Sequence, residues 1–291
     1  MKRVLVTGMN GQVGHSLMAF GTVFGFDMIG CCRQQLDVTS GIQVARMMHS
    51  IQPDIVINAA AYTAVDDAEL DEKAALMINE HAVLNLANSC SIAKIPLFHI
   101  STDYVFDGSK AGPYIETDKV APINAYGRSK VAGEEAIRRV LGQHIILRTS
   151  WVFSENGDSF PRKMMQLAAD HKEIKVIADQ LGGPTSANSI ARALLTIIKS
   201  EKPLWGTYHF SGMPDVSWFD FADKIFSLAK AEGYLKNRPE LLAISSDGYQ
   251  TLARRPKNSR LCCDKIFQNF GISRDSWKDD LFISASNKGS R

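Results

Sequence analysis

The chain has 291 residues, of which 45% are hydrophobic and 22% are charged, a composition ordinary for a globular protein of one large domain or two modest ones. Its formal net charge of +2 is too small to indicate a surface that binds polyanions, so we expect no nucleic-acid partner. It contains no apolar run of about 20 residues, so we expect no membrane partner either.

The first predicted strand, Val4–Val6, runs directly into a glycine-rich turn and then a helical pattern. Glycine permits positive φ and lets a backbone come close to a ligand. A helix N-terminus offers free N–H groups and a partial positive charge to a pyrophosphate. The order strand, glycine turn, helix therefore predicts a dinucleotide site, whose residues here are Gly8, Asn10, Gly11, Gln12, Val13 and Gly14.

The second predicted strand, 27–32, ends at Arg33. In a dinucleotide fold this strand end meets the adenosine ribose, where an acidic residue favours NAD and an arginine accommodates the 2′-phosphate of NADP. Arg33 therefore predicts NADPH, with NADH as the alternative. Asp37 and Val38 follow, and we place them near the adenine.

Two further apolar strands end in residues suited to a ligand. The strand 53–58 leads into the small residues Ala59, Ala60 and Ala61, which let a flat ligand lie against the backbone, and then Thr63. The strand 96–100 ends at Ser101 and Thr102, whose hydroxyls could hold a carbonyl oxygen.

Strands and helices alternate through the first half of the chain, which predicts an α/β fold with a parallel, doubly wound, Rossmann-like sheet. The regularity is lost later, where we expect a smaller C-terminal α/β lobe that binds substrate. We assign 1–170 to the dinucleotide-binding domain, with 185–212 returning to it. Residues 171–184 and 213–291 form the substrate lobe.

Tyr126 and Lys130 stand four residues apart on a predicted helix, and therefore on one face of it. A nearby ammonium favours phenolate and lowers a phenol pKa that is ordinarily ~10. Such a phenol can deliver a proton to a carbonyl near neutral pH.

Five cysteines are an odd number without C-x-x-C spacing, and no signal-like segment begins the chain. We therefore expect reduced thiols and a cytoplasmic protein.

With these segments in view, the chain resembles the dTDP-4-dehydrorhamnose reductases of the extended short-chain dehydrogenase/reductase superfamily. The resemblance rests on the glycine turn and on five further stretches, which are 58–66, 101–106, 126–130, 148–152 and 179–185, together with 255–261 near the C-terminus. It implies that NAD(P)H reduces the 4-keto group of a nucleotide-linked 6-deoxyhexose.

The resemblance also implies roles for particular residues. Tyr126 would be the proton donor, Lys130 would lower its pKa and bind the nicotinamide ribose, and Thr102 would hydrogen-bond the substrate carbonyl. The other substrate-binding residues that it implies are Asp103, Val105, Trp151, Arg255 and Asn258.

Some members of the family carry a glutamate after the third glycine, linked to metal-bridged dimers. His15 and Ser16 stand there in this chain, so we expect no such metal, and a homodimer stays open. Two alternatives to the rhamnose-forming reaction also stay open. One is a reductase of another 4-keto nucleotide sugar, giving talose or another deoxyhexose, and the other is a non-catalytic relative that binds NADP and regulates a partner.

Overall fold

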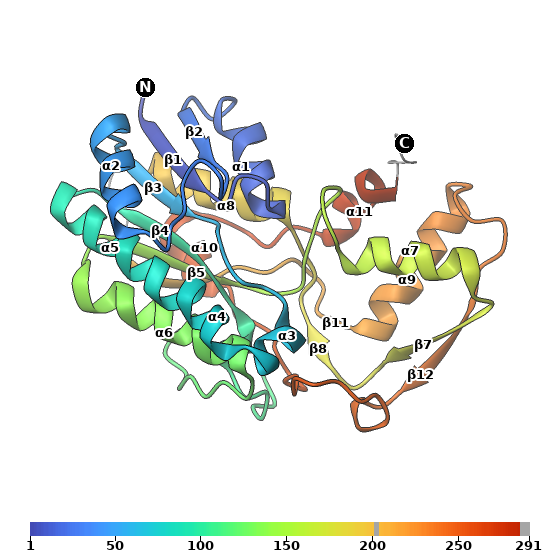
Figure 1. Ribbon diagram of the computed structural model, residues 1–291. Helices are drawn as coiled ribbons and strands as arrows, with labels where there is room; N and C mark the ends of the chain where they lie inside the picture. Colours follow the sequence, from blue (N-terminus) through green and yellow to red (C-terminus); the bar gives the residue numbers. More distant parts are fainter. Residues whose placement is uncertain (201–203, 286–291) are drawn as a thin grey trace.

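A six-stranded parallel sheet forms the centre of the larger domain in the computed structural model, which describes residues 1–200 and 204–285 (Figure 1). The chain places β2 on one side of β1 and β3 on the other, so the direction of winding reverses at β1. Ligands of such sheets bind at this reversal, beyond the carboxyl ends of the strands. In spatial order the strands are β10 (Gly206–His209), β5 (His144–Thr149), β4 (Leu97–Thr102), β3 (Ile55–Asn58), β1 (Arg3–Thr7) and β2 (Asp27–Cys31).

Helices cover both faces of this sheet, which explains why its strands are apolar on both sides. Side chains alternate along a strand, so Val4 and Val6 pack toward α1 (Gln12–Gly21) and α8 (Ala187–Lys199). Leu5, between them, packs in the opposite core. That core is covered by α2 (Gly41–Ile51), α5 (Ala82–Ala93) and α6 (Ala125–Val140). The predicted Rossmann-like α/β architecture is confirmed.

The helix predicted from residue 72 to 93 is interrupted. Asp71 caps α4 (Glu72–Leu76) by accepting from the backbone N–H of Ala74 at 3.0 Å, and a π-helical turn at 77–81 precedes α5. Asn79 lies in that turn, fully buried, and its amide hydrogen-bonds Tyr62 and Ser129. The short α3 (Val65–Leu70) comes before α4.

The smaller lobe has its own core, in which the rings of Phe221 and Trp277 pack edge to face with their centroids 5.0 Å apart. None of the helices in the described residues is both long and apolar enough to span a membrane. The helices of this part of the protein are α7 (Phe160–Asp170), α9 (Trp218–Ala231) and α11 (Trp277–Ala285). Its strands form three short pairs, which are β7 (Glu173–Ile177) with β12 (Glu240–Ile244), β8 (Leu181–Gly182) with β11 (Val216–Ser217), and β6 (Val152–Phe153) with β9 (Thr185–Ser186).

The packing differs from the predicted domain boundaries at two helices. Met164 of α7, which we placed in the first domain, packs in the core of the smaller lobe. Ile266 of α10 (Asp264–Phe270), which we placed in the lobe, packs in the core of the larger domain. Amphipathic helices show which face is buried but not against which partner, so the sequence left both assignments undetermined.

A buried ion pair fixes α6 against the sheet. Glu134 is fully buried and accepts from Arg148 of β5 at 2.7 and 2.9 Å and from Ser101 of β4 at 2.5 Å. Burial alone would raise the pKa of Glu134, but the hydrogen bonds and charge of Arg148 lower it to about 2. The first turns of α6 are thereby held beside the end of β4.

Candidate functional site

Two adjoining cavities lie at the carboxyl ends of β1, β3 and β4, where the winding of the sheet reverses. One, of about 380 Å³, extends over the end of β2, and the other, of about 440 Å³, reaches from the glycine turn to α6 and the smaller lobe. They share Gly11 and the segment 59–61, so together they form one elongated site. Most of the predicted cofactor-binding residues line it.

The glycine turn has the geometry of a phosphate cradle. Gly8 has φ of +69°, and a Cβ there would lie 2.7 Å from the backbone nitrogen of Ala60. A Cβ on Gly14 would lie 2.2 Å from the carbonyl oxygen of Gly8. Only glycine fits these two positions, and the N-cap of α1 is Gly11, which has no side chain to occupy the helix N-terminus. The turn therefore fits a pyrophosphate.

The end of β2 forms the far wall of the smaller cavity. Arg33 is exposed there and lines it together with Asn10, Asp37 and Val38. Hydrogen bonds from the side chain and backbone of Thr39, at 2.7 and 3.0 Å, lower the pKa of Asp37 and orient its carboxylate. The cation of Arg33 beside this anion gives the cavity a charged end that suits a ribose phosphate.

The three alanines after β3 form the floor between the two cavities, and Thr63 lies farther along the larger one. Gln12 and Val13 line the larger cavity as well. The side-chain amide nitrogen of Gln12 donates to the backbone carbonyl oxygen of Asp158, at 2.9 Å. The loop that carries Asp158 therefore lies against the glycine turn. Asp158 and Val65 also line this cavity, although no sequence motif placed them in the site.

The three predicted catalytic residues meet in the larger cavity. Thr102 ends β4, and Tyr126 and Lys130 come from the first two turns of α6, all three lining the same wall. Asn124 begins α6 by accepting from the backbone N–H of Gly127 at 2.7 Å. Tyr104 packs edge to face on Tyr126 with ring centroids 6.0 Å apart. The phenol is thereby held next to the threonine hydroxyl.

Burial, Thr102 and Asp103 shift the pKa of Tyr126 in this structure, and an effect of Lys130 on that pKa stays a prediction. Burial raises the pKa of Tyr126 to about 12, and the hydrogen bond with Thr102 opposes burial only in part. The amine of Lys130 donates to the carbonyl oxygen of Ile100, at 2.7 Å, and lies 3.4 Å from His99 Nε2. Burial lowers the pKa of Lys130 to about 8.

Asp103 is the buried carboxyl group of the site. Its side chain is 2% exposed, and its Oδ1 accepts from the Thr102 hydroxyl at 3.1 Å. Its Oδ2 is buried without a hydrogen-bond partner. Burial raises the pKa of Asp103 to about 7, so the group can carry a proton near neutral pH.

Val105, which the resemblance implied as a substrate-binding residue, lies outside both cavities. It is fully buried in a separate core with Phe106, Tyr114 and Leu261 and does not line either cavity. A 3₁₀ turn at 103–105 follows β4 and rotates the side chains out of the alternation that an extended segment would give.

An aromatic wall comes from the smaller lobe. Trp151 stacks on Trp218 with ring centroids 3.5 Å apart and planes 5° apart, and both rings line the larger cavity. Trp151 has φ of +46°, which is rare and costly for a large side chain. Trp218 was not predicted, because an aromatic residue at the start of a helix is ordinarily part of a core.

Arg255 and Asn258 do not line the cavities and are engaged within the protein. Arg255 pairs with Asp66, at 2.5 Å between Nη2 and Oδ2. The Asn258 amide nitrogen donates to the carbonyl oxygens of Lys110 and Gly112, at 2.6 and 2.8 Å, and its Oδ1 accepts from Arg260. Their roles toward substrate stay predictions.

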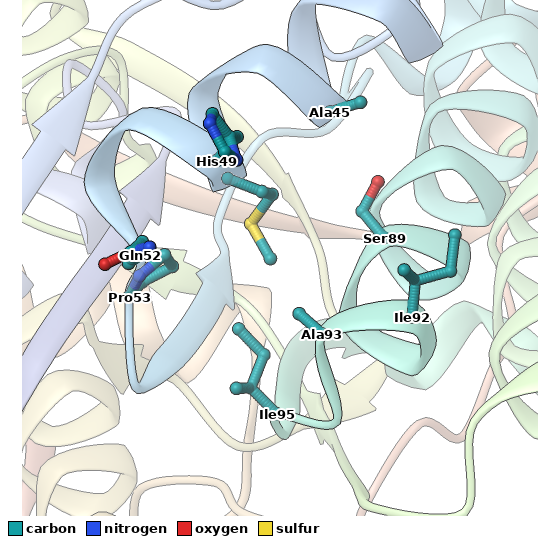
Figure 2. Close-up of a pocket in the computed structure, with 9 residues that line it drawn as sticks. Ala45, His49, Gln52, Pro53, Ser89, Ile92, Ala93 and Ile95 are labelled. Carbon is teal, nitrogen blue, oxygen red and sulfur yellow. The ribbon is translucent and has the colours of Figure 1, made fainter.

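Another cavity, of about 420 Å³, lies between the C-terminal ends of α2 and α5 and is shown in Figure 2. Its lining includes Met48, His49, Ile92 and Ile95, and none of the predicted site residues contributes to it. Within residues 1–200 and 204–285, no three His, Cys, Asp or Glu side chains gather as a metal ion would require.

Comparison with known proteins adds to this geometry. Residues 1–287 match the family model described as RmlD substrate binding domain. A protein of Aggregatibacter actinomycetemcomitans named dTDP-4-dehydrorhamnose reductase is 43% identical over 286 residues, with 97% of each chain covered.

Two solved structures have a similar fold over nearly the whole chain. A dTDP-4-dehydrorhamnose reductase of Bacillus anthracis, in complex with NADP, is 36% identical, with 97% of each chain covered and a TM-score of 0.90. One from Clostridium acetobutylicum is 33% identical, with 96% of each chain covered and a TM-score of 0.90.

Proposed function

Because this chain belongs to the dTDP-4-dehydrorhamnose reductase family, we propose that it reduces dTDP-4-dehydro-L-rhamnose to dTDP-L-rhamnose with NADPH. The observation that carries the proposal is the meeting of Thr102, Tyr126 and Lys130 in a cavity continuous with the glycine turn. A phosphate cradle at one end and a proton donor at the other are what a carbonyl reductase requires.

The residues fit NADPH at three points. The glycine turn leaves room for a pyrophosphate that any Cβ on Gly8 or Gly14 would remove. The three alanines let a flat ring lie on the backbone, and Arg33 supplies the cation for a 2′-phosphate. When bound, the cofactor supplies the hydride that reduces the carbonyl carbon.

The protein's own part is to hold the carbonyl and deliver a proton to its oxygen. The Tyr126 phenol, kept protonated by burial, donates to the oxygen as negative charge develops there. The Thr102 hydroxyl lies beside the phenol and orients the same oxygen. The stacked Trp151 and Trp218 offer the sugar an apolar face and exclude water from that side.

The decisive experiment is turnover of the purified protein with dTDP-4-dehydro-L-rhamnose and NADPH, followed by the absorbance of NADPH and by NMR of the product. Formation of dTDP-L-rhamnose supports the proposal. A 4-epimeric, talose-configured product would show the alternative reductase. Binding of NADPH without turnover of any 4-keto nucleotide sugar would show the regulatory relative.

We also propose a cytoplasmic location, since all five cysteines are free and burial raises the pKa of Cys90 to about 12, which keeps that thiol unreactive. A homodimer is proposed from the family resemblance alone, and light scattering of the purified protein tests it.

A further inference from the structure

A row of polar side chains crosses the buried sheet behind the catalytic residues. Thr7, Asn58 and His99 are aligned neighbours on β1, β3 and β4, and each is at most 2% exposed. The row ends at Lys130 of α6, whose amine lies 3.4 Å from His99 Nε2. None of the three lines the cavities, and His99 reaches the catalytic residues through Lys130.

The backbone N–H of Ala60 determines which groups in this row donate hydrogen bonds and which accept them. The Oδ1 of Asn58 accepts from the N–H of Ala60 at 3.1 Å and from the hydroxyl of Thr7 at 2.7 Å. A backbone N–H can only donate, so the amide cannot be turned the other way without placing two donors together. The Nδ2 of Asn58 therefore faces His99 Nδ1, at 3.1 Å.

The tautomer of His99 follows from this direction. Because Asn58 Nδ2 donates, His99 Nδ1 must accept, and a neutral ring then carries its proton on Nε2. Burial first, and then the charge of Lys130, lower the pKa of His99 well below its usual range, so the ring is neutral. The Nε2–H group thus points at Lys130, and only an uncharged amine has a lone pair to accept it.

We propose that His99 is a positioning residue that favours the neutral amine form of Lys130, and that Asn58 imposes this by fixing the tautomer of His99. The inference rests on the proposed function in assigning Lys130 to the catalytic site. If Lys130 is biased toward the neutral amine in this way, activity falls as the pH rises because Lys130 loses its proton, and not because Tyr126 does.

Other charged and titratable groups around Lys130 shift its pKa or the pKa of Tyr126 beside it. Burial lowers the pKa of Lys130 to about 8, while the carboxylate of Glu134, one turn along α6, opposes this. Arg148 of β5 neutralises Glu134 directly. Tyr126, on the same helix, is kept neutral by burial, and Asp103 of the 3₁₀ turn acts on that phenol.

The first test measures the tautomer directly. ¹⁵N NMR of the full chain without cofactor or substrate reports which ring nitrogen of His99 carries the proton, with His99→Phe identifying the signal. We expect a bare Nδ1 and a protonated Nε2 between about pH 6 and pH 8. A proton on Nδ1, or a doubly protonated ring at neutral pH, overturns the proposal whatever the enzyme's activity.

The second test reverses the direction of the hydrogen bond between residue 58 and His99. A carboxylate only accepts hydrogen bonds, so Asn58→Asp should move the proton of His99 to Nδ1 and let Nε2 accept from a charged Lys130. The pKa of Lys130, read from its ¹³Cε shift, and the alkaline limb of kcat should both rise by about one pH unit or more. An unchanged tautomer in a folded Asn58→Asp protein overturns the proposal.

Thr7→Val is the matched control. It removes a hydroxyl from the same row, but the N–H of Ala60 still orients Asn58. The tautomer of His99 and the pKa of Lys130 should stay as in the wild type, and a change in either contradicts the proposal. If Asn58→Asp does not fold, the wild-type measurement decides alone. If the wild-type protein does not turn over the substrate, the proposed function is refuted, but the tautomer of His99 is still decided by the NMR measurement.

Discussion

Asp66 accepts hydrogen bonds from both terminal nitrogens of Arg255, at 2.5 and 3.2 Å. The backbone N–H of Ala253 donates to the same carboxylate at 3.0 Å. This contact joins the segment before α10 to the start of α3, next to the larger cavity. The hydrogen bond from Arg255 lowers the pKa of Asp66, so the pair stays charged at neutral pH. A diphosphate that uses Arg255 must compete with Asp66 for it.

We predict that Arg255→Ala weakens binding of the nucleotide sugar by ~1.5–3 kcal/mol, the range for a hydrogen bond to a charged group. Binding of NADPH should hardly change, because the glycine turn holds its phosphates. Calorimetric titration of the variant with each ligand checks both statements. Loss of NADPH affinity, or full retention of nucleotide-sugar affinity, contradicts the assignment.

Asp66→Asn is the matched variant for the same pair. It removes the competing carboxylate but keeps the arginine, so nucleotide-sugar binding should be retained or tightened. If both variants weaken binding equally and both lower Tm, the pair is a structural clasp and the phosphate role is refuted.

For Tyr126→Phe we expect kcat to fall by ~10²-fold or more, because the proton donor is lost, with NADPH binding kept. Tyr104 is half-buried like Tyr126, packs edge to face on it and lines the same cavity, but its phenol has no hydrogen bond with Thr102. Tyr104→Phe should therefore lower kcat far less. Single-turnover kinetics of both variants separate them, and near-wild-type turnover of Tyr126→Phe would remove that phenol from the mechanism.

Arg33→Ala should raise KM for NADPH by about tenfold or more, since a charged hydrogen bond to the 2′-phosphate is lost. KM for NADH, which lacks that phosphate, should change little. Gln34→Ala, at the neighbouring position in the same wall, removes no charge and serves as the control. Equal effects of Arg33→Ala on both cofactors would place Arg33 outside the cofactor site.

The geometry of the glycine turn could be predicted from the sequence because its signals are local. A strand, a glycine turn and a helix follow one another within residues 3–21, and their order alone dictates where phosphates bind. The same holds for Tyr126 and Lys130, which one helix places on one face.

The substrate half depends on contacts that no local pattern contains. Arg255 meets a partner 189 positions away, and Trp218 lines the cavity stacked on Trp151, which adopts a left-handed backbone conformation. Val105 is turned into a core by three residues of 3₁₀ helix. The pKa of Tyr126 depends on how completely the folded chain covers the phenol, which the spacing of Tyr126 and Lys130 does not contain.

Asp103 should make the stability of the protein depend on pH in an unusual direction. Burial raises the pKa of its carboxyl group from 3.8 to about 7 in the folded state. Between these values the folded protein holds a proton that the unfolded chain has lost, so stability falls as the pH rises through this range and is constant above it. Each unit of pKa difference corresponds to ~1.4 kcal/mol.

Asp103→Asn removes this titration while keeping a side chain of the same shape. Its Tm should exceed that of the wild type at pH 8, and the difference should shrink as the pH falls from about 7 toward 4. Asp107→Asn provides the opposite case, because hydrogen bonds from Ser109 and Tyr114 lower the pKa of Asp107. That variant should be less stable than the wild type at pH 7, with a deficit that stays nearly constant down to about pH 4, because Asp107 is ionised in both the folded and the unfolded state above its ordinary pKa of 3.8. Thermal unfolding of the three proteins from pH 4 to pH 8 compares these slopes, and a constant offset for Asp103→Asn across the range would show that Asp103 is ionised throughout.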